Sequence, residues 1–115
     1  MRRGDIVLVS LDPAVGSEQG KVRPAVVVSS DAANRSAESS GRGVITVVPI
    51  TSNVSRIYPF QAFLPMEDSG LARPGKAQAE QVRSVSVERV VKVIGVVVAE
   101  RMGEVDDALR RHLGL

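Results

Sequence analysis

The chain has 115 residues, of which 43% are hydrophobic and 24% are charged, and its formal net charge is +2. This length predicts one domain, residues 1–115, with a single hydrophobic core. No apolar run approaches the roughly 18–20 residues of a membrane span, and the N-terminus carries no recognisable secretory signal. The absence of cysteine excludes disulfides and thiol chemistry. We therefore expect a cytoplasmic protein without a membrane anchor.

Arginine predominates among the 15 basic residues, and guanidinium is the side chain best shaped for bidentate phosphate binding. A GC-rich genome produces the same excess, so only the positions of the arginines can argue for nucleic-acid binding. The chain has one tyrosine, two phenylalanines and no tryptophan. This argues against RNA-binding modules that stack bases on several aromatic side chains.

Short valine-rich runs separated by turn residues dominate the sequence, and this pattern predicts a small all-β barrel or sandwich. The branched Cβ of valine suits a pleated, half-buried surface. We expect strands near residues 5–11, 24–30, 43–50, 59–64, 77–82 and 89–99. Gly95 falls inside the last of these and predicts a bend or bulge.

Two segments between the strands carry helix and turn signals. Residues 31–39 can start a short helix capped by Ser30 or Asp31, and the sequence SSGRG that ends at Gly43 predicts a flexible loop. Residues 66–76 predict a second long loop, which Pro74 and Gly75 close as a turn.

The C-terminal residues 103–113 predict a helix. Its apolar side chains recur at helical spacing, and acidic residues in the first turn precede basic residues in the last, which matches the helix dipole. The expected buried stripe consists of Val105, Ala108, Leu109 and Leu113. Gly114 is expected to close the helix as a left-handed cap.

The sequence carries few groups for metal or histidine chemistry. His112 is the only histidine, which excludes a nuclease mechanism based on a histidine pair. Asp106 and Asp107 form an adjacent acidic pair on the expected helix, and we interpret them as helix-dipole complement and solvated surface. Phosphate-cradling and serine-hydrolase motifs are also absent. We expect no metal site and no cofactor.

Polar residues gather in three stretches where a strand gives way to a loop, which is a common way to build a site. The stretches are GSEQGKVRPAVVVSS (residues 16–30), VVPITSN (47–53) and AEQVRSVS (79–86). Taken singly, each has a structural explanation: Thr51 and Ser52 as turn residues, and Arg83 as a surface salt-bridge partner.

Taken together and in this order, with RGDIVLVSLDP before them and YPFQAFL between the last two, the stretches resemble the MazF/PemK (Kid) family of toxin endoribonucleases. The resemblance implies an SH3-like β-barrel with short helices and a C-terminal helix. It also implies a homodimer and metal-independent cleavage of single-stranded RNA. The implied inhibitor is a cognate antitoxin with an acidic C-terminal tail, so that the chain is the toxin of a type II toxin–antitoxin system.

The resemblance also implies roles for particular residues. Arg23 and Thr51 match the catalytic arginine and threonine of the family, and Glu18 matches an acidic position implicated in some members. The implied RNA-binding residues are Gln19, Lys21, Ser52, Asn53, Gln81, Arg83 and Ser84. Two features depart from the family pattern: Glu80 stands where an aspartate is common, and residues 31–43 form a longer segment than in the most compact members.

Physical chemistry gives these roles a rationale. Pro24 restricts Arg23 to extended geometry where the loop meets the sheet. A guanidinium group stays charged, so it suits a preorganised clamp on phosphate oxygens as negative charge develops. Thr51 can donate a hydrogen bond to the same phosphate, and Glu18 is the candidate base for the ribose 2′-hydroxyl. Attack by that hydroxyl gives a 2′,3′-cyclic phosphate and a 5′-hydroxyl end.

A binding protein on the same barrel is the alternative. CcdB-like toxins bind and poison DNA gyrase without a nuclease site. The gyrase-binding interpretation leaves Arg23, Thr51 and the GSEQ sequence unexplained. A third possibility, an SH3-like adaptor, leaves the family motifs unexplained.

Overall fold

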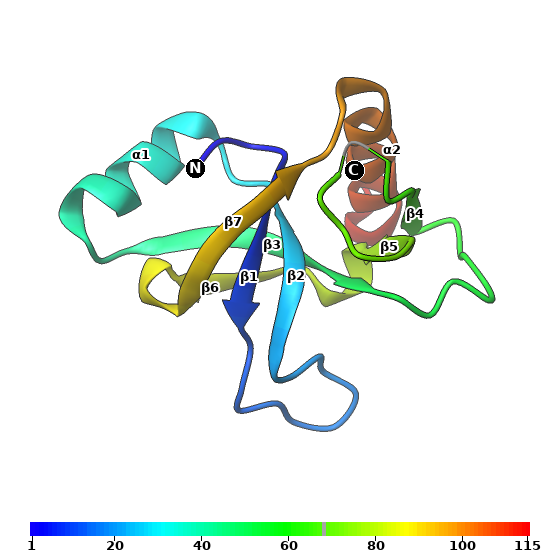
Figure 1. The fold of residues 1–115 in the computed structure, drawn as a ribbon, viewed down its shortest axis with the longest axis horizontal. Coiled ribbons are helices and arrows are strands. Elements are labelled where there is room, and N and C mark those ends of the chain that lie inside the picture. The colour runs from blue at the N-terminus through cyan, green and yellow to red at the C-terminus, as the bar shows by residue number, and fades with distance from the viewer. Residues whose placement is uncertain (68) are drawn as a thin grey trace.

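In a computed structural model of the chain, which describes residues 1–67 and 69–115, the backbone forms an antiparallel sheet of seven strands and two α-helices (Figure 1). The strands are β1 (Asp5–Ser10), β2 (Val22–Val27), β3 (Val44–Thr51), β4 (Gln61–Leu64), β5 (Gly75–Gln78), β6 (Arg83–Ser86) and β7 (Val90–Val96). The helices are α1 (Asp31–Ser40) and α2 (Ala99–Leu113), with short 3-10 turns η1 (Ala79–Gln81) and η2 (Val87–Arg89). The fold is therefore mainly β with a C-terminal helix, as the sequence predicts.

Strand β3 connects the two parts of the sheet. Its middle pairs with β2, its first half pairs with β6, and its last two residues, Ile50 and Thr51, pair with β5. The main path through the sheet runs β4-β5-β3-β2-β1-β7. A strand of eight residues accumulates enough right-handed twist to serve two differently oriented groups of strands.

The sheet stays open where the resemblance implies a closed barrel, because β4 and β7 do not pair within residues 1–67 and 69–115. Instead, the backbone of Ser69 and Gly70 lies against Ile94 and Gly95. A Cβ on Gly95 would collide with the Ser69 carbonyl oxygen, and Gly70 has a φ of +80°. Ile6 pairs with Gly95 while Val7 pairs with Val93, so the ladder skips one residue of β7 and the predicted bulge is confirmed.

Several predicted strand boundaries differ in the structure. The strand expected over 24–30 runs from Val22 to Val27, and β6 (Arg83–Ser86) was not expected as a strand. The strand expected over 77–82 is wrong, because β5 ends at Gln78 and η1 separates it from β6. This break lets β5 pair with the end of β3 while β6 pairs with its beginning. The strand expected over 89–99 ends at Val96, and α2 begins at Ala99 rather than at Gly103. Gly103 lies within the first turns of α2, and because glycine is rare inside helices the sequence did not predict the turn before it.

The helix caps follow the sequence. The Ser30 hydroxyl accepts a hydrogen bond from the Ala33 backbone N–H, so the N-cap of α1 is confirmed. Gly114 has a φ of 73° and its N–H bonds to the Arg110 carbonyl, which confirms the left-handed C-cap of α2. Leu113 is exposed, so the predicted apolar stripe is one residue too long.

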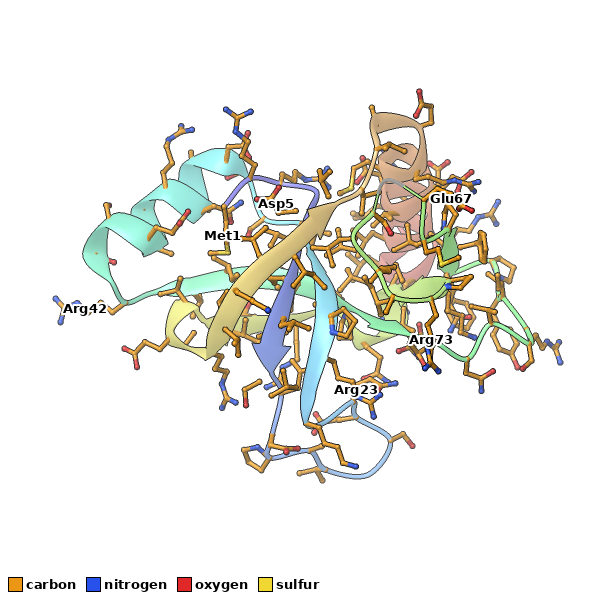
Figure 2. The ribbon with its side chains drawn as sticks, in the orientation of Figure 1. Met1, Asp5, Arg23, Arg42, Glu67 and Arg73 are labelled. Atoms are coloured by element: carbon orange, nitrogen blue, oxygen red, sulfur yellow. The ribbon has the colours of Figure 1, made fainter. Side chains whose placement is uncertain are left out.

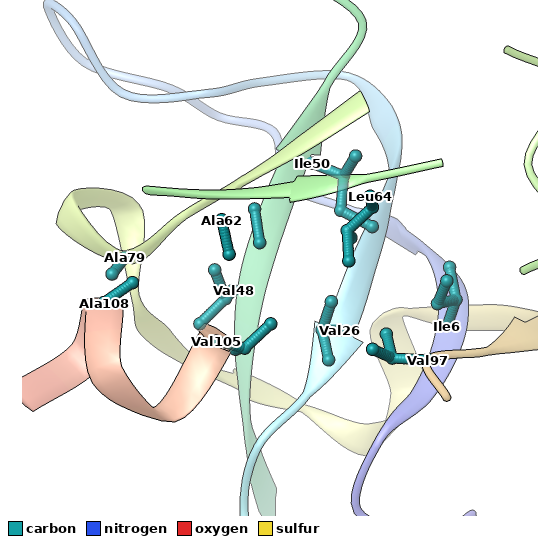
Figure 3. Packing of buried hydrophobic residues seen from close by; sticks show 11 residues of the cluster. Ile6, Val26, Val48, Ile50, Ala62, Leu64, Ala79, Val97, Val105 and Ala108 are labelled. Atoms are coloured by element: carbon teal, nitrogen blue, oxygen red, sulfur yellow. The ribbon is translucent and has the colours of Figure 1, made fainter. Parts of the chain in front are cut away.

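Both faces of the central strands β1, β2 and β3 carry buried side chains, which explains their near-continuous apolar runs. On one face, Val48 and Ile50 of β3 pack with Leu64, Val105 and Ala108 under α2 (Figure 3). The other face holds a second cluster beneath α1, made of Val7, Val9, Leu11, Ala25, Val27, Ala37, Ile45, Val47 and Val85. Figure 1 shows α1 and α2 on opposite sides of the central strands.

Asp68, within the loop expected over 66–76, lies outside the described residues. In the rest of the chain, no helix is both long enough and apolar enough to cross a bilayer.

Candidate active site

Arg23 and Thr51 lie where β2 begins and β3 ends. The paired register of β2 and β3 ends with Ala25 opposite Pro49, and Arg23 and Thr51 each lie two residues beyond that pair. Residues far apart in the sequence thus follow the same end of the β2–β3 ladder.

The Arg23 side chain is half-buried. Its Nε donates to the Gly20 carbonyl at 3.2 Å, which fixes the guanidinium plane. Within residues 1–67 and 69–115, its two terminal amino groups have no hydrogen-bond partner and no carboxylate within 4.0 Å. Arg23 therefore presents an oriented cation with free donors, which is the state that a phosphate clamp requires.

The Thr51 hydroxyl is held by its own loop. Its Oγ1 accepts a hydrogen bond from the Asn53 backbone N–H at 3.3 Å, so its O–H is free to donate. Asn53 Oδ1 in turn accepts from the Ser55 hydroxyl at 2.8 Å. Ser52 and Asn53 are both exposed. The turn after β3 thus fixes the position of the Thr51 hydroxyl oxygen.

The loop between β1 and β2 is tied to the η1 region. The Gln19 N–H donates to Gln81 Oε1 at 3.1 Å, and Gln19 Nε2 donates to Gln78 Oε1 at 2.9 Å. Gln81 Nε2 completes the connection by donating to the Ser17 carbonyl at 3.1 Å. These bonds hold the GSEQ sequence against β5 and η1, so the first and third polar stretches are brought together.

A pocket of about 240 Å³ lies at this junction. Its lining residues are Glu18, Gln19, Pro49, Glu80, Gln81, Val82 and Arg83. Arg83 also donates to the Leu11 carbonyl at 3.2 Å, which anchors its side chain beside the loop. Four of the predicted site residues, Glu18, Gln19, Gln81 and Arg83, thus share one pocket.

A second pocket, of about 380 Å³, contains Arg23. Its lining residues are Leu8, Arg23, Pro24, Ile50, Ser52, Gly70, Leu71, Ala72, Arg73, Pro74, Gly75, Lys92 and Ile94. The floor is apolar, and three cations, Arg23, Arg73 and Lys92, line it. Figure 2 shows Arg23 and Arg73 on the same side of the molecule, with Arg42 at its opposite end.

Sequence reasoning missed Arg73 and Lys92. A signal existed for each: Arg73 precedes Pro74 just as Arg23 precedes Pro24, and Lys92 interrupts a valine run. Their relation to Arg23 depends on the contact between the 69–75 segment and β7, which no local pattern reveals.

Four predicted residues, Lys21, Thr51, Asn53 and Ser84, line neither pocket, whereas Glu18 lines the smaller one and is held within its own loop. Glu18 Oε1 accepts from the Val15 N–H at 2.8 Å, which shapes its own loop, and no ion pair joins it to Arg23 within the described parts of the chain. Lys21 and Ser84 are exposed and line neither pocket. Ser84 pairs with Thr46 on the part of β3 far from Thr51.

Carboxylates near the site do not form a metal-binding group. Across residues 1–67 and 69–115, no three His, Cys, Asp or Glu side chains gather in a way that could hold a metal ion. Glu80 accepts a hydrogen bond from Gln61 Nε2 at 2.6 Å through one oxygen. Its other oxygen is buried without a hydrogen-bond partner in the described structure.

Known proteins resemble this chain along its whole length. Residues 2–113 match the family described as PemK-like, MazF-like toxin of type II toxin–antitoxin system. The chain is 55% identical over 115 residues to endoribonuclease MazF9 of Mycobacterium tuberculosis, covering 100% of this chain and 98% of that protein. It is 32% identical over 116 residues to endoribonuclease EndoA of Bacillus subtilis, covering 100% and 96% respectively.

The fold has a solved counterpart as well. The crystal structure of MazF from Deinococcus radiodurans gives a TM-score of 0.80 at 29% identity, covering 100% of this chain and 97% of that one. The crystal structure of a MazE–MazF complex from the same organism gives a TM-score of 0.75 at 26% identity, covering 100% of this chain and 96% of that one. Both sequence relatives are named endoribonucleases, which favours the enzyme over the gyrase-binding alternative.

Proposed function

The chain belongs to the PemK/MazF family of toxin endoribonucleases of type II toxin–antitoxin systems, and from this premise we propose that it cuts single-stranded RNA by metal-independent transesterification. Arg23 and Thr51 are the proposed catalytic residues. The observation that carries this assignment is the oriented Arg23 guanidinium, whose terminal amino groups have no protein partner in the described residues, with the Thr51 hydroxyl following the same end of the β2–β3 ladder.

In the proposed reaction, the ribose 2′-hydroxyl attacks the adjacent phosphate and expels the 5′-oxygen of the next nucleotide. The products are a 2′,3′-cyclic phosphate and a 5′-hydroxyl end. Arg23 and Thr51 donate to the phosphate oxygens, where negative charge grows as the new bond forms. Fixed donors contribute most there, because they need no reorganisation during the reaction.

Glu18 is the proposed base that accepts the proton of the 2′-hydroxyl. One of its oxygens is engaged by Val15, which holds the carboxylate in place, and it lines the 240 Å³ pocket beside Gln19 and Gln81. We propose that this pocket and the segment Ser52–Asn53 bind the RNA on either side of the cut, with Lys21, Arg83 and Ser84 contacting its backbone. Positive charge suits this task because phosphate contacts dominate RNA affinity.

The proposed partners are an antitoxin and a second copy of the chain. An acidic C-terminal tail of the antitoxin would occupy the pocket lined by Arg23, Arg73 and Lys92 and order as it binds. A dimer is supported by β7, an edge strand of the described sheet that leaves Val91 and Val93 59% and 50% exposed. Pairing such surfaces in a symmetric dimer removes them from water. The proposed place of action is the cytoplasm, where the RNA is found.

Incubation of the purified protein with RNA in excess EDTA tests the proposed chemistry. We expect cleavage to continue undiminished, because the nucleophile belongs to the substrate and the charge is stabilised by side chains. Sequencing of the fragments should find 5′-hydroxyl termini and cyclic phosphates. Loss of cleavage in EDTA, restored by Mg²⁺, or the appearance of 5′-phosphates would refute the mechanism.

Substitution of Thr51 distinguishes its hydroxyl from its shape. Thr51→Ser keeps the donor and should retain most activity. Thr51→Val keeps the shape and should lose about ten- to a hundredfold in kcat/KM, the effect of removing one hydrogen bond to a charged group. Thermal unfolding of both variants controls for stability, since Thr51→Val also removes the acceptor for the Asn53 N–H. Equal activity of the two variants would assign Thr51 a purely structural role.

A further inference from the structure

Two of the three aromatic side chains of the protein gather in the segment after Thr51. The rings of Tyr58 and Phe60 are stacked, with centroids 5.3 Å apart and planes inclined by 9°. The Arg56 guanidinium lies over the Tyr58 ring, 4.6 Å from its centroid. Tyr58 nevertheless remains 38% exposed, and Arg56 is also exposed. An aromatic stack that served the core alone would bury these groups.

The first tether of this segment leads to Thr51. Lys76 of β5 pairs opposite Thr51, and its Nζ donates to the Arg56 carbonyl at 2.5 Å. Lys76 is only 7% exposed, so a buried side chain holds the segment around Arg56 in place. Its Nζ also lies 5.8 Å from the centroid of the Tyr58 ring. The stack is therefore fixed close to the end of β3.

The second tether leads to the 240 Å³ pocket. The Tyr58 N–H donates to Gln61 Oε1 at 3.1 Å, and Gln61 Nε2 donates to Glu80 Oε2 at 2.6 Å. Glu80 lines that pocket together with Gln19 and Arg83. The two tethers start from different strands, so they position the Tyr58 backbone and ring relative to both parts of the candidate site.

We propose that Arg56, Tyr58 and Phe60 form a stacking platform for a nucleobase of single-stranded RNA, beside the bond that is cut. Single-stranded bases stack on aromatic rings and on guanidinium planes, and a nearby cation attracts the phosphate that follows the base. This inference rests on the proposed function and adds a base-binding residue, Tyr58, that the polar motifs do not include. Because every base has a π-face, the platform holds the strand and leaves sequence selection to other residues.

Intrinsic fluorescence tests the platform without any substitution, because Tyr58 is the only tyrosine and the chain has no tryptophan. The probe is a short 2′-O-methyl RNA of mixed sequence, which lacks the nucleophile. We expect its binding to quench the tyrosine emission to saturation. The control is an abasic oligonucleotide with the same backbone, which binds through charge and should leave the emission largely unchanged.

Kinetics on cleavable RNA give a second measurement. Tyr58→Leu should raise KM about 5- to 150-fold with little change in kcat, the effect expected for one stacked base, whereas Tyr58→Phe keeps the ring and should behave as wild type. Arg56→Gln should raise KM as well. Arg42→Gln removes the same charge at the opposite end of the molecule and should not (Figure 2).

The outcomes separate this inference from the function on which it rests. If the wild type cleaves RNA but Tyr58→Leu keeps the wild-type KM, or if abasic and base-bearing probes quench equally, the platform is wrong and the nuclease stands. If the wild type cleaves no RNA but only base-bearing probes quench Tyr58, the nuclease is wrong and the platform stands as an RNA-binding site.

Discussion

Arg23→Ala is expected to lower kcat/KM for RNA cleavage by about a hundred- to a thousandfold, the usual effect of removing one preorganised donor from a developing oxyanion. The guanidinium is held by a single bond from Nε to the Gly20 carbonyl, and its terminal amino groups have no hydrogen-bond partner among the described residues. The reaction increases the negative charge on the phosphate at the moment when these donors are needed. The loss should therefore appear mainly in kcat.

Two companion variants make the Arg23 measurement specific. Arg23→Lys keeps the charge but loses the planar fork, so it should recover only a small part of the activity. Arg73→Ala removes a second cation that lines the same pocket and also precedes a proline, and it should cost much less. If Arg73→Ala and Arg23→Ala are equally impaired, the pocket acts through its overall positive potential and Arg23 has no special place in it.

Loss of the fold is not expected to explain the Arg23→Ala result. The substitution removes one neutral-acceptor hydrogen bond at the start of β2, which typically contributes about 0.5–1.5 kcal/mol. Neighbouring positions of β2 stay paired with both β1 and β3. Each kcal/mol lost from the free energy of unfolding should lower the melting temperature by about 4–8 °C. Circular dichroism at the assay temperature verifies that the variant is folded.

The sequence was informative where a local constraint determines geometry. Pro24 restricts its neighbour wherever the chain goes, and Arg23 lies in the extended strand β2 as predicted. Thr51 ends β3 because a polar turn follows a run of apolar residues, and Ser30 and Gly114 cap their helices through side-chain or backbone properties of their own. These features need no knowledge of the tertiary structure.

The predictions were wrong where tertiary contacts determine strand boundaries and the grouping of site residues. The strand breaks after Gln78 because β5 and β6 pair with different parts of β3. The local sequence AEQV does not predict this break. The site was predicted as one unit, yet Arg23 and Glu18 line different pockets, because the hydrogen bonds that Gln19 donates to Gln78 and Gln81 hold the GSEQ sequence against η1. The low aromatic content argued against base stacking, but it could not reveal that Tyr58 and Phe60 stack on each other near Thr51.

A single 2′-deoxy substitution in the substrate should abolish cleavage at one bond and leave all others unaffected. In the proposed mechanism the attacking oxygen is the 2′-hydroxyl on the 5′ side of the scissile bond, so removing it removes the nucleophile itself. Arg23 and Thr51 act as hydrogen-bond donors in this mechanism, and Glu18 is proposed to take its proton from the ribose hydroxyl rather than from water. The loss should therefore be complete at that bond, exceeding the effect of any side-chain substitution.

The experiment uses an RNA with one mapped cleavage position, synthesised in three forms. The first is unmodified, the second carries the deoxyribose immediately 5′ of the scissile bond, and the third carries it one nucleotide further upstream. The third form keeps the nucleophile and controls for altered sugar pucker or binding, so it should be cut like the unmodified RNA. Cleavage of the second form at the mapped bond, with a 5′-phosphate or a 3′-phosphate that is never cyclic, would mean that water is the nucleophile. Arg23 and Thr51 would then serve a hydrolytic site, and the role of Glu18 as the base for the ribose would fall with the mechanism.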